Sequence, residues 1–473
     1  MPTRPQGARS RPDGARRSGP AWRSQDVTPW SSTSSAGRWT SPRSRRRRPS
    51  SAPEEPVGPG ALPRTRERTS RGGAAVREPV GLRERGNPPT REPEVWTPDL
   101  LEKVAWRVKA ANEPFRGVAT SDGVRRGLFP LRETGADVRE VHRAAENYLA
   151  GLTEKQLAEG RFRMDDVSWR HWNNGARYFL RHGICLEEFD AAGRERALAV
   201  IRESLSADGY RQTVDLMRLN LTIGELSDNT HGLNEWLYWF SLYGEPENGG
   251  PWGWQLDGHH VNINCAFVGD QMVLTPSFLG AEPVIAGSGK YAGTMAFRGE
   301  EALGHELFTQ LGHGQRERAV LADTMPSELY AGAFRDNFEL DQRGLRLSEM
   351  SPGQRDTALR LLGLYVNRAG DPHARVRREE VLSHEGETHF GWVGDPDGTF
   401  YYRFHSPVIL VEFEHMPGVL FDNDYHSRRH IHTVVRTPNG NDFGVDLLRQ
   451  HHERHHRPRK DPPGPQIRSP HHP

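Results

Sequence analysis

The fold is decided by the stretch 252-WGWQLDGHHVNINCAFV-268. Apolar and polar residues alternate along it, which is typical of a β-strand that buries one face. The pair Gly269-Asp270 then predicts a turn, and residues 272–275 return as a second, antiparallel strand. The sequence therefore predicts one long strand over 252–268 with an antiparallel neighbour.

Strand patterns recur on both sides of this stretch. An aromatic-rich strand precedes it at 236–243, and short loops join three or four further strands at 389–393, 399–404, 408–413 and 430–436. Segments with helical periodicity occupy 98–108, 138–149, 187–205, 212–225, 300–312, 315–321 and 352–366. Strand clusters that are separated by helical segments predict an α+β fold, with a mainly antiparallel sheet and helices from two interspersed helical blocks.

Composition divides the 473 residues into three parts. The first 95 are dominated by Arg, Pro, Ser and Gly and hold 20 arginines against nine acidic residues, so we expect them to be disordered. An over-extended start codon would also explain this segment. The His- and Pro-rich tail at 451–473 is expected to be disordered as well, which leaves a single globular domain at 96–450.

Charge and apolar content disfavour several classes of protein. The net charge is +1, but basic residues gather in the two tails, so residues 96–448 carry a net charge of −14. Such an acidic core disfavours specific nucleic-acid binding. The two cysteines, Cys185 and Cys265, are too few for a disulfide framework or a thiolate zinc cluster. Because we find neither a membrane-spanning apolar run nor a signal peptide, we expect a cytoplasmic protein, with secretion as the alternative if the start is wrongly assigned.

One polar cluster lies inside the stretch that decides the fold. On a strand, His260, Asn262 and Asn264 share one face, opposite Val261 and Ile263. The functional interpretation is a pocket wall, in which the imidazole is a metal ligand or general base and the amides orient a substrate. The simpler interpretation is a strand face that meets solvent, and the sequence does not decide between the two.

The second cluster is His430-Ile431-His432. On a strand the two imidazoles share a face, a spacing that can present two nitrogens to one metal ion. His405 and Glu412 flank another predicted strand, and a turn after 436 could return Asp442 to the same end of the sheet. Two histidines and a carboxylate suit iron, and three histidines suit zinc. A hydrogen-bonded polar network without a metal is the alternative.

A set of motifs runs from one end of the predicted domain to the other. Its members are 169–172, 182–184, 243–246, 251–260, 390–392, 401–404, 407–412, 430–436 and 441–444. Together they resemble a bacterial and fungal domain of unknown function, DUF3500, over roughly residues 98–450. The resemblance implies no activity, because the family has none assigned. It implies export for many members, whereas this sequence shows no recognisable signal.

The combined hypothesis is a metal-assisted enzyme, either a hydrolase or an oxidoreductase, that acts on a small molecule in a His-rich pocket. The predicted ligands of a divalent transition metal, zinc or iron, are His260, His405, His430 and His432. The predicted catalytic carboxylates are Glu412 and Asp442, and the predicted substrate-binding residues are His259, Asn262, Trp254, Arg403 and Arg436. We expect neither a membrane nor a specific nucleic-acid partner. The alternatives are a non-catalytic binding module for a small molecule and a buried histidine network that only stabilises the sheet.

Overall fold

The computed structural model describes residues 97–175, 180–419 and 421–455, all within one compact unit. The segment 1–95 and the tail beyond residue 455, both expected to be disordered, lie outside the described residues. The described helices are α1 (Pro98–Asn112), α2 (Arg139–Ala150), α3 (Glu154–Gly160), α4 (Ala191–Ser204), α5 (Ala207–Leu226), α6 (Arg298–Gln310), α7 (His313–Ala319), α8 (Pro352–Val366), α9 (Asp371–Ser383) and α10 (Val445–His455). The described strands are β1 (Arg161–Phe162), β2 (Ile184–Cys185), β3 (Tyr238–Gly244), β4 (Trp252–Gly258), β5 (Val261–Val268), β6 (Gln271–Val273), β7 (Ser277–Ala281), β8 (Leu345–Arg346), β9 (His389–Gly394), β10 (Phe400–His405), β11 (Leu410–Pro417) and β12 (His426–Arg436).

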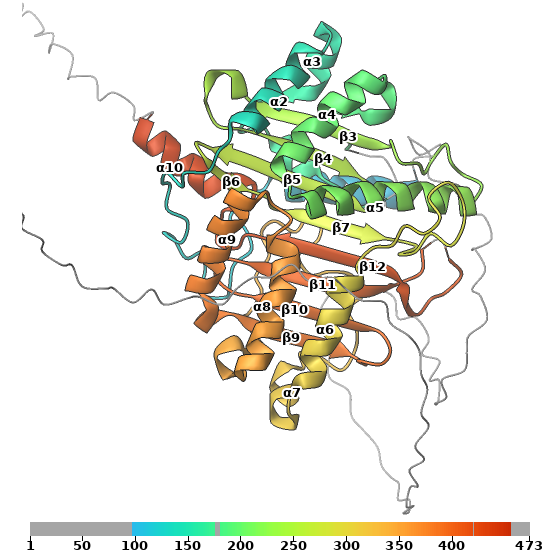
Figure 1. The fold of residues 1–473 in the computed structure, drawn as a ribbon, viewed down its shortest axis with the longest axis vertical. Coiled ribbons are helices and arrows are strands. Elements are labelled where there is room, and N and C mark those ends of the chain that lie inside the picture. The colour runs from blue at the N-terminus through green and yellow to red at the C-terminus, as the bar shows by residue number, and fades with distance from the viewer. Residues whose placement is uncertain (1–96, 176–179, 420, 456–473) are drawn as a thin grey trace, which may run out of the picture. The chain divides into compact units, whose positions relative to one another are not determined.

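The twelve strands form one sheet, shown in Figure 1. Its order is β1-β3-β4-β5-β7-β12-β11-β10-β9-β8, with β2 beside β3 and β6 beside β5. Neighbours are antiparallel except β1 and β3, which pair in parallel. The two halves of the sheet meet where β7 pairs with β12, the last of the described strands. That seam brings the predicted polar cluster of β5 close to the histidines of β12.

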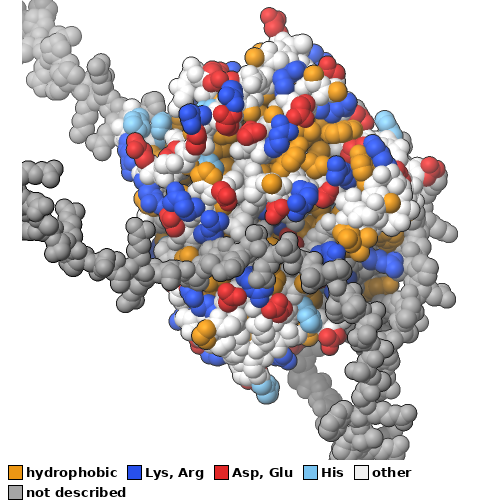
Figure 2. Space-filling view, viewed as in Figure 1, with side chains coloured by type: hydrophobic (Ala, Val, Ile, Leu, Met, Phe, Trp, Pro, Cys, Tyr) orange, Lys and Arg blue, Asp and Glu red, His pale blue; other side chains and the backbone are white. Residues whose placement is uncertain are grey.

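Helices cover one face of the sheet (Figure 1). On this face the indole N–H of Trp254 donates to the hydroxyl of Ser204, at the end of α4, over 2.9 Å. In the other half of the sheet the hydroxyls of Tyr402 and Tyr365 lie 2.5 Å apart, which ties β10 to α8. The strand side chains here are mainly aromatic and aliphatic and are buried. The outer surface of this helical side mixes Lys and Arg with Asp and Glu (Figure 2).

The opposite face of the sheet buries polar side chains beside an apolar cluster and is covered mainly by irregular chain. Trp169 stacks there on Tyr243, with ring centroids 3.8 Å apart. The backbone N–H groups of Tyr330 and Ala331 donate to the Glu412 carboxylate over 3.0 and 2.8 Å. In irregular chain, many backbone N–H and C=O groups are free to bond with side chains, whereas those inside a helix are already paired with each other. A covering of loops therefore explains how this face can bury so many polar side chains.

The predicted α+β class is confirmed, with one correction in the stretch that decides it. Residues 252–268 form two strands, β4 and β5, joined by the two-residue turn His259-His260. Because the turn has only two residues between the paired Gly258 and Val261, polar and apolar residues keep alternating through it. The sequence pattern therefore looks like that of one continuous strand. β7 and α9 were not predicted, and α10 carries regular structure to His455. None of the described helices combines the length and apolar character needed to cross a bilayer.

Candidate metal centre

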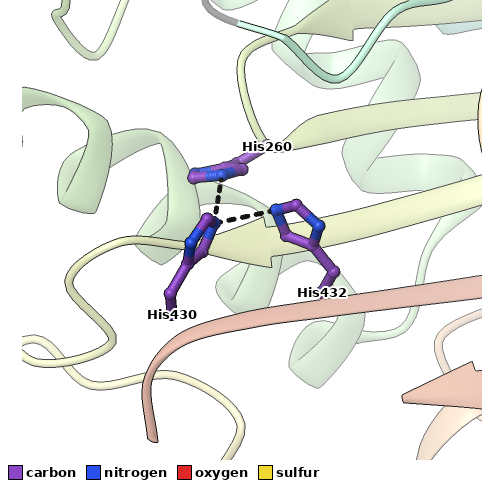
Figure 3. A group of neighbouring side chains, drawn as sticks. All are labelled: His260, His430 and His432. Atoms are coloured by element: carbon purple, nitrogen blue, oxygen red, sulfur yellow. Dashed lines mark hydrogen bonds between the residues drawn. The ribbon is translucent and has the colours of Figure 1, made fainter. Parts of the chain in front are cut away.

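His260 occupies the turn between β4 and β5. Its backbone lies in the left-handed region, with φ at +64°, which is unfavourable for a residue that carries a side chain. Two hydrogen bonds hold it there. Its N–H donates to the carbonyl of Asn174 over 3.3 Å, and its carbonyl accepts from the N–H of Gly280 over 2.7 Å. The turn thereby directs the His260 imidazole toward β12 (Figure 3).

The other two histidines come from β12. Because side chains alternate along a strand, His430 and His432 both lie on the polar face. Gly280 of β7 is the pairing partner of His432. A Cβ at position 280 would lie 2.7 Å from Cδ2 of His432 and 3.1 Å from Cδ2 of His260. The missing side chain at 280 therefore makes room for both rings.

The three imidazoles meet through their Nε2 atoms (Figure 3). Nε2 of His430 lies 2.9 Å from Nε2 of His432 and 3.3 Å from Nε2 of His260. Zinc–nitrogen bonds of about 2.0–2.1 Å put neighbouring nitrogens of a tetrahedral site about 3.3–3.4 Å apart. Within the described residues, no further His, Cys, Asp or Glu joins this group of possible ligands. The spacing fits three nitrogen ligands of one ion.

Hydrogen bonds alone do not satisfy the three Nε2 atoms. Nδ1–H of His430 donates to the carbonyl of Pro417 over 2.8 Å, so Nε2 of the neutral ring has one lone pair and no proton. Nε2 of His260 and Nε2 of His432 both approach that lone pair, which can accept only one well-aligned hydrogen bond. A cation at the meeting point would instead use a lone pair from each ring.

Burial keeps the rings neutral. It lowers the pKa of His260 and of His432 well below the usual histidine value, and neighbouring imidazoles lower both further. Burial also lowers the pKa of His430, although the Glu282 carboxylate opposes the change. Neutral imidazole is the form that binds a metal, so no proton has to leave before an ion binds at neutral pH.

Two buried carboxyl groups lie behind the rings. Oε2 of Glu282 is 3.9 Å from Nδ1 of His430, and Oε1 of Glu414 is 3.9 Å from Nδ1 of His432. Burial, with the nearby Glu412, raises the pKa of Glu414 well above the usual value. Carboxyl groups in this position commonly orient metal-binding histidines. At 3.9 Å, each carboxyl oxygen lies slightly beyond hydrogen-bond distance of its Nδ1 atom.

Of the predicted substrate-binding residues, His259 contacts one of the three histidines, His260, and Asn262 follows His260 by two residues. The ring of His259 stacks on that of His260 with centroids 3.9 Å apart, and its Nδ1 lies 2.7 Å from Oδ1 of Asn220. Nδ2 of Asn262 donates to the carbonyl of Gly258 over 2.5 Å. Its Oδ1 is buried and has no hydrogen-bond partner among the described residues. His259 is thus packed against the candidate centre, and Asn262, nearby in the sequence, has a buried acceptor without a partner among the described residues.

His405 does not join the other predicted ligands. It lies on β10, two strands from β12, and its partner on β11 is Leu410. Leu410 is four residues from Glu414, the partner of His432, so the offset along the strand is about 13 Å. Arg403, two residues from His405, donates to the carbonyl of Asp341 over 3.4 Å. The expected meeting of four histidines is corrected to three.

The remaining predicted residues are held by other contacts. Trp254 lies on the helix-covered face, away from the histidines. Besides its two backbone donors, Glu412 accepts from the hydroxyl of Tyr401 over 2.7 Å. Arg436 donates to Asp442 and to Asp336, each over 2.7 Å. The structure places neither predicted catalytic carboxylate with the three histidines.

A family model described as "Protein of unknown function (DUF3500)" matches residues 134–445, a span that holds all three histidines. The chain belongs to the DUF3500 family. No curated protein and no solved structure matches it. The functional argument for this DUF3500 chain therefore rests on the geometry of its own residues.

Four residues around the three histidines were not found by sequence reasoning: Gly280, Glu282, Glu414 and Pro417. Glu414 left a usable signal, because it lies two residues from Glu412 and so shares its strand face. Gly280 and Pro417 act through their positions beside the rings, and those positions follow from strand pairing that the sequence does not reveal.

Proposed function

We propose that this DUF3500 chain is a metal-dependent enzyme that acts on a small molecule, with zinc or iron held by His260, His430 and His432. The observation that carries the proposal is the approach of Nε2 of His260 and Nε2 of His432 to within 3.3 Å of Nε2 of His430, whose one lone pair cannot satisfy both by hydrogen bonding. The left-handed backbone at His260 and the missing side chain at Gly280 support it. Unfavourable backbone conformations of this kind gather at functional sites.

The number of ligands favours catalysis over a purely structural metal. Structural zinc sites usually have four protein ligands, whereas catalytic sites have three and leave a position for water or substrate. When bound in such a site, zinc makes hydroxide available near neutral pH, which suits a hydrolase, and iron would suit an oxidoreductase. Glu414, whose raised pKa favours the protonated form, is the nearby group that could hold a proton during a reaction.

One observation favours a second function for the same residues. All three rings are buried, and the 2.9 Å contact between His430 and His432 has the length of an N–H···N hydrogen bond. A histidine network that only stabilises the sheet would show that contact too. The two functions differ in a measurable way, because only the first requires a metal.

The test is the metal content of the full-length protein, purified without a histidine tag and exposed briefly to a weak chelator. We expect about one equivalent of zinc or iron by mass spectrometry, and His432→Ala and His260→Ala should each remove most of it. His313→Ala, on an exposed turn of α7, is the matched control. A triple replacement of His451, His452 and His455 removes the histidines of α10 that could also hold a metal.

The contrary outcome is equally clear. Less than about a tenth of an equivalent of any transition metal, in protein reloaded with zinc or with iron, would contradict the metal-dependent function. If His432→Ala then lowers the free energy of unfolding by about 1–3 kcal/mol, the structural network is the better description.

A further inference from the structure

The helix α1 packs on the rest of the described molecule mainly through one side. Ala111 on that side is fully buried, and the guanidinium of Arg107 lies 5.5 Å from the ring centroid of Phe334. The carbonyl of Ala110 accepts from Nη2 of Arg170 over 2.9 Å. Because α1 also precedes the span that the family model matches, its outer side is a feature of this chain outside that span.

The outer side of α1 exposes apolar side chains. Leu101 is 52 % exposed, Trp106 is 52 % exposed and Val108 is 38 % exposed. Leu101 and Val108 are seven residues apart, so they lie on one line along the helix, and the exposed Ala105 lies beside that line. Apolar side chains that are exposed together are typical of a contact with another molecule.

Two opposite charges complete this exposed side. Glu102 and Lys109 are also seven residues apart, so they form a second line along the helix, between Ala105 and Trp106. Both are exposed, and neither forms an ion pair with a described residue. The acidic residue lies in the first half of α1 and the basic residue in its last turn. A helix with opposite charges toward its two ends is complementary to a reversed copy of itself.

A second copy that packs antiparallel on α1, with a two-fold axis beside Ala105, would match these residues. In such a pair, side chains on the same flank of the two helices meet, and their order along the helix is reversed. Leu101 would then contact Val108 of the second copy, and Glu102 would pair with Lys109 of the second copy, each contact occurring twice. Ala105 would meet its own counterpart, and its small side chain would let the two helices approach closely.

We propose that the protein forms a symmetric dimer through the exposed side of α1, on which a second copy of the chain packs in antiparallel orientation. Such a contact uses the same surface on both copies, so it closes after two copies. A helix of 15 residues is about 22 Å long, and a pair of such helices buries less than the roughly 1,200 Å² of a standard interface. The dimer is therefore weak, with a Kd of about 1–100 µM.

The test is sedimentation equilibrium of the full chain at low ionic strength, over a range of concentrations that brackets this Kd. Glu102→Lys and Lys109→Glu each place like charges opposite one another twice, so each should weaken dimerisation about fivefold or more. The double variant restores opposite charges and should return the Kd to within about twofold of its original value. Glu154→Lys and Lys155→Glu, at exposed positions of α3, are the matched controls and should leave the Kd unchanged.

A cysteine beside the two-fold axis gives a second measurement. Ala105→Cys would face its counterpart, and both native cysteines are buried, so mild oxidation should link two chains through position 105. Ala158→Cys, at an exposed position of α3, is the control and should link far more slowly. Three results would each overturn the proposal: a chain that stays monomeric up to about 300 µM, a double charge variant that dimerises no better than the single variants, or an Ala105→Cys protein that links no faster than the control.

Discussion

At the scale of single residues, Gly280 shows how a missing side chain can build a site. His260 and His432 reach the meeting point of the three rings only because nothing projects from Gly280 between them. The residue is also fixed in the sheet by its pairing with His432 and by its N–H bond to His260. One position therefore serves both the sheet and the spacing of the three imidazole rings.

Gly280→Ala should displace at least one ring and weaken zinc binding about tenfold or more, because ligand orientation sets metal affinity. The affinity can be measured by competition with a chromogenic chelator. Gly353→Ala is the matched control, since a Cβ at Gly353 of α8 would meet no atom within 4 Å. If Gly280→Ala binds zinc as tightly as the unaltered protein, the spacing of the rings does not decide metal binding.

The sequence predicted the three histidines of the candidate centre but not how their rings are arranged. His430 and His432 could be named because alternation places them on one strand face, and His260 because the alternation runs on through the turn that it occupies. His405 met the same criterion and lies elsewhere, because alternation gives the face of a side chain but not its height along the sheet. That height depends on strand register, which is set by pairing between distant segments.

At the scale of elements, the segments with the strongest local signal were predicted well. α8 was predicted at 352–366, the range observed, because Ser351 caps it and Pro352 opens it. α9 was missed because Asp371-Pro372 reads as a turn, although a proline in the first turn equally begins a helix. β7 was missed because its residues, Ser-Phe-Leu-Gly-Ala, include a glycine and do not alternate clearly between polar and apolar.

His405, on strand β10, leads to a prediction about stability at low pH. Burial, with Arg403 as a second cause, lowers the pKa of His405 to about 3, whereas in the unfolded chain its value is about 6.5. Between these values only the unfolded state takes up the proton. With respect to His405, the folded state therefore has its full stability above about pH 6.5. The free energy of unfolding decreases as the pH falls from there toward 3.

The free energy of unfolding, measured with urea at several pH values, should fall less steeply between pH 6.5 and 4 in His405→Gln than in the unaltered protein. His313→Gln, at an exposed position on α7, should keep the original slope. Parallel curves for His405→Gln and the unaltered protein would show that this histidine is not neutral and buried in the folded state.

At the scale of the whole described molecule, the centre spans the seam of the sheet. His260 belongs to the half that contains β3, β4 and β5, and His430 and His432 belong to the half that contains β9–β12. An ion held by all three would join the halves where β7 pairs with β12. Metal binding should consequently stabilise the sheet as a unit.

Zinc at about 100 times its dissociation constant should add about 2.7 kcal/mol to the stability of the folded state, enough to raise Tm by several degrees. Differential scanning calorimetry with zinc and with a chelator measures the shift. His260→Ala should abolish it, and His451→Ala, in α10, should not. An equal shift in the His260→Ala protein would place the bound zinc elsewhere on the chain.

The central place of β12 also matters while the chain is being made. Its pairing edge on β7 leaves the ribosome about 150 residues before β12 does, a delay of roughly 8–30 s at common rates of translation. During that time the first half carries an open edge in what becomes the middle of the sheet, and open edges invite pairing with other chains. We therefore expect nascent chains of this protein to need either protection of the β7 edge or rapid completion of synthesis.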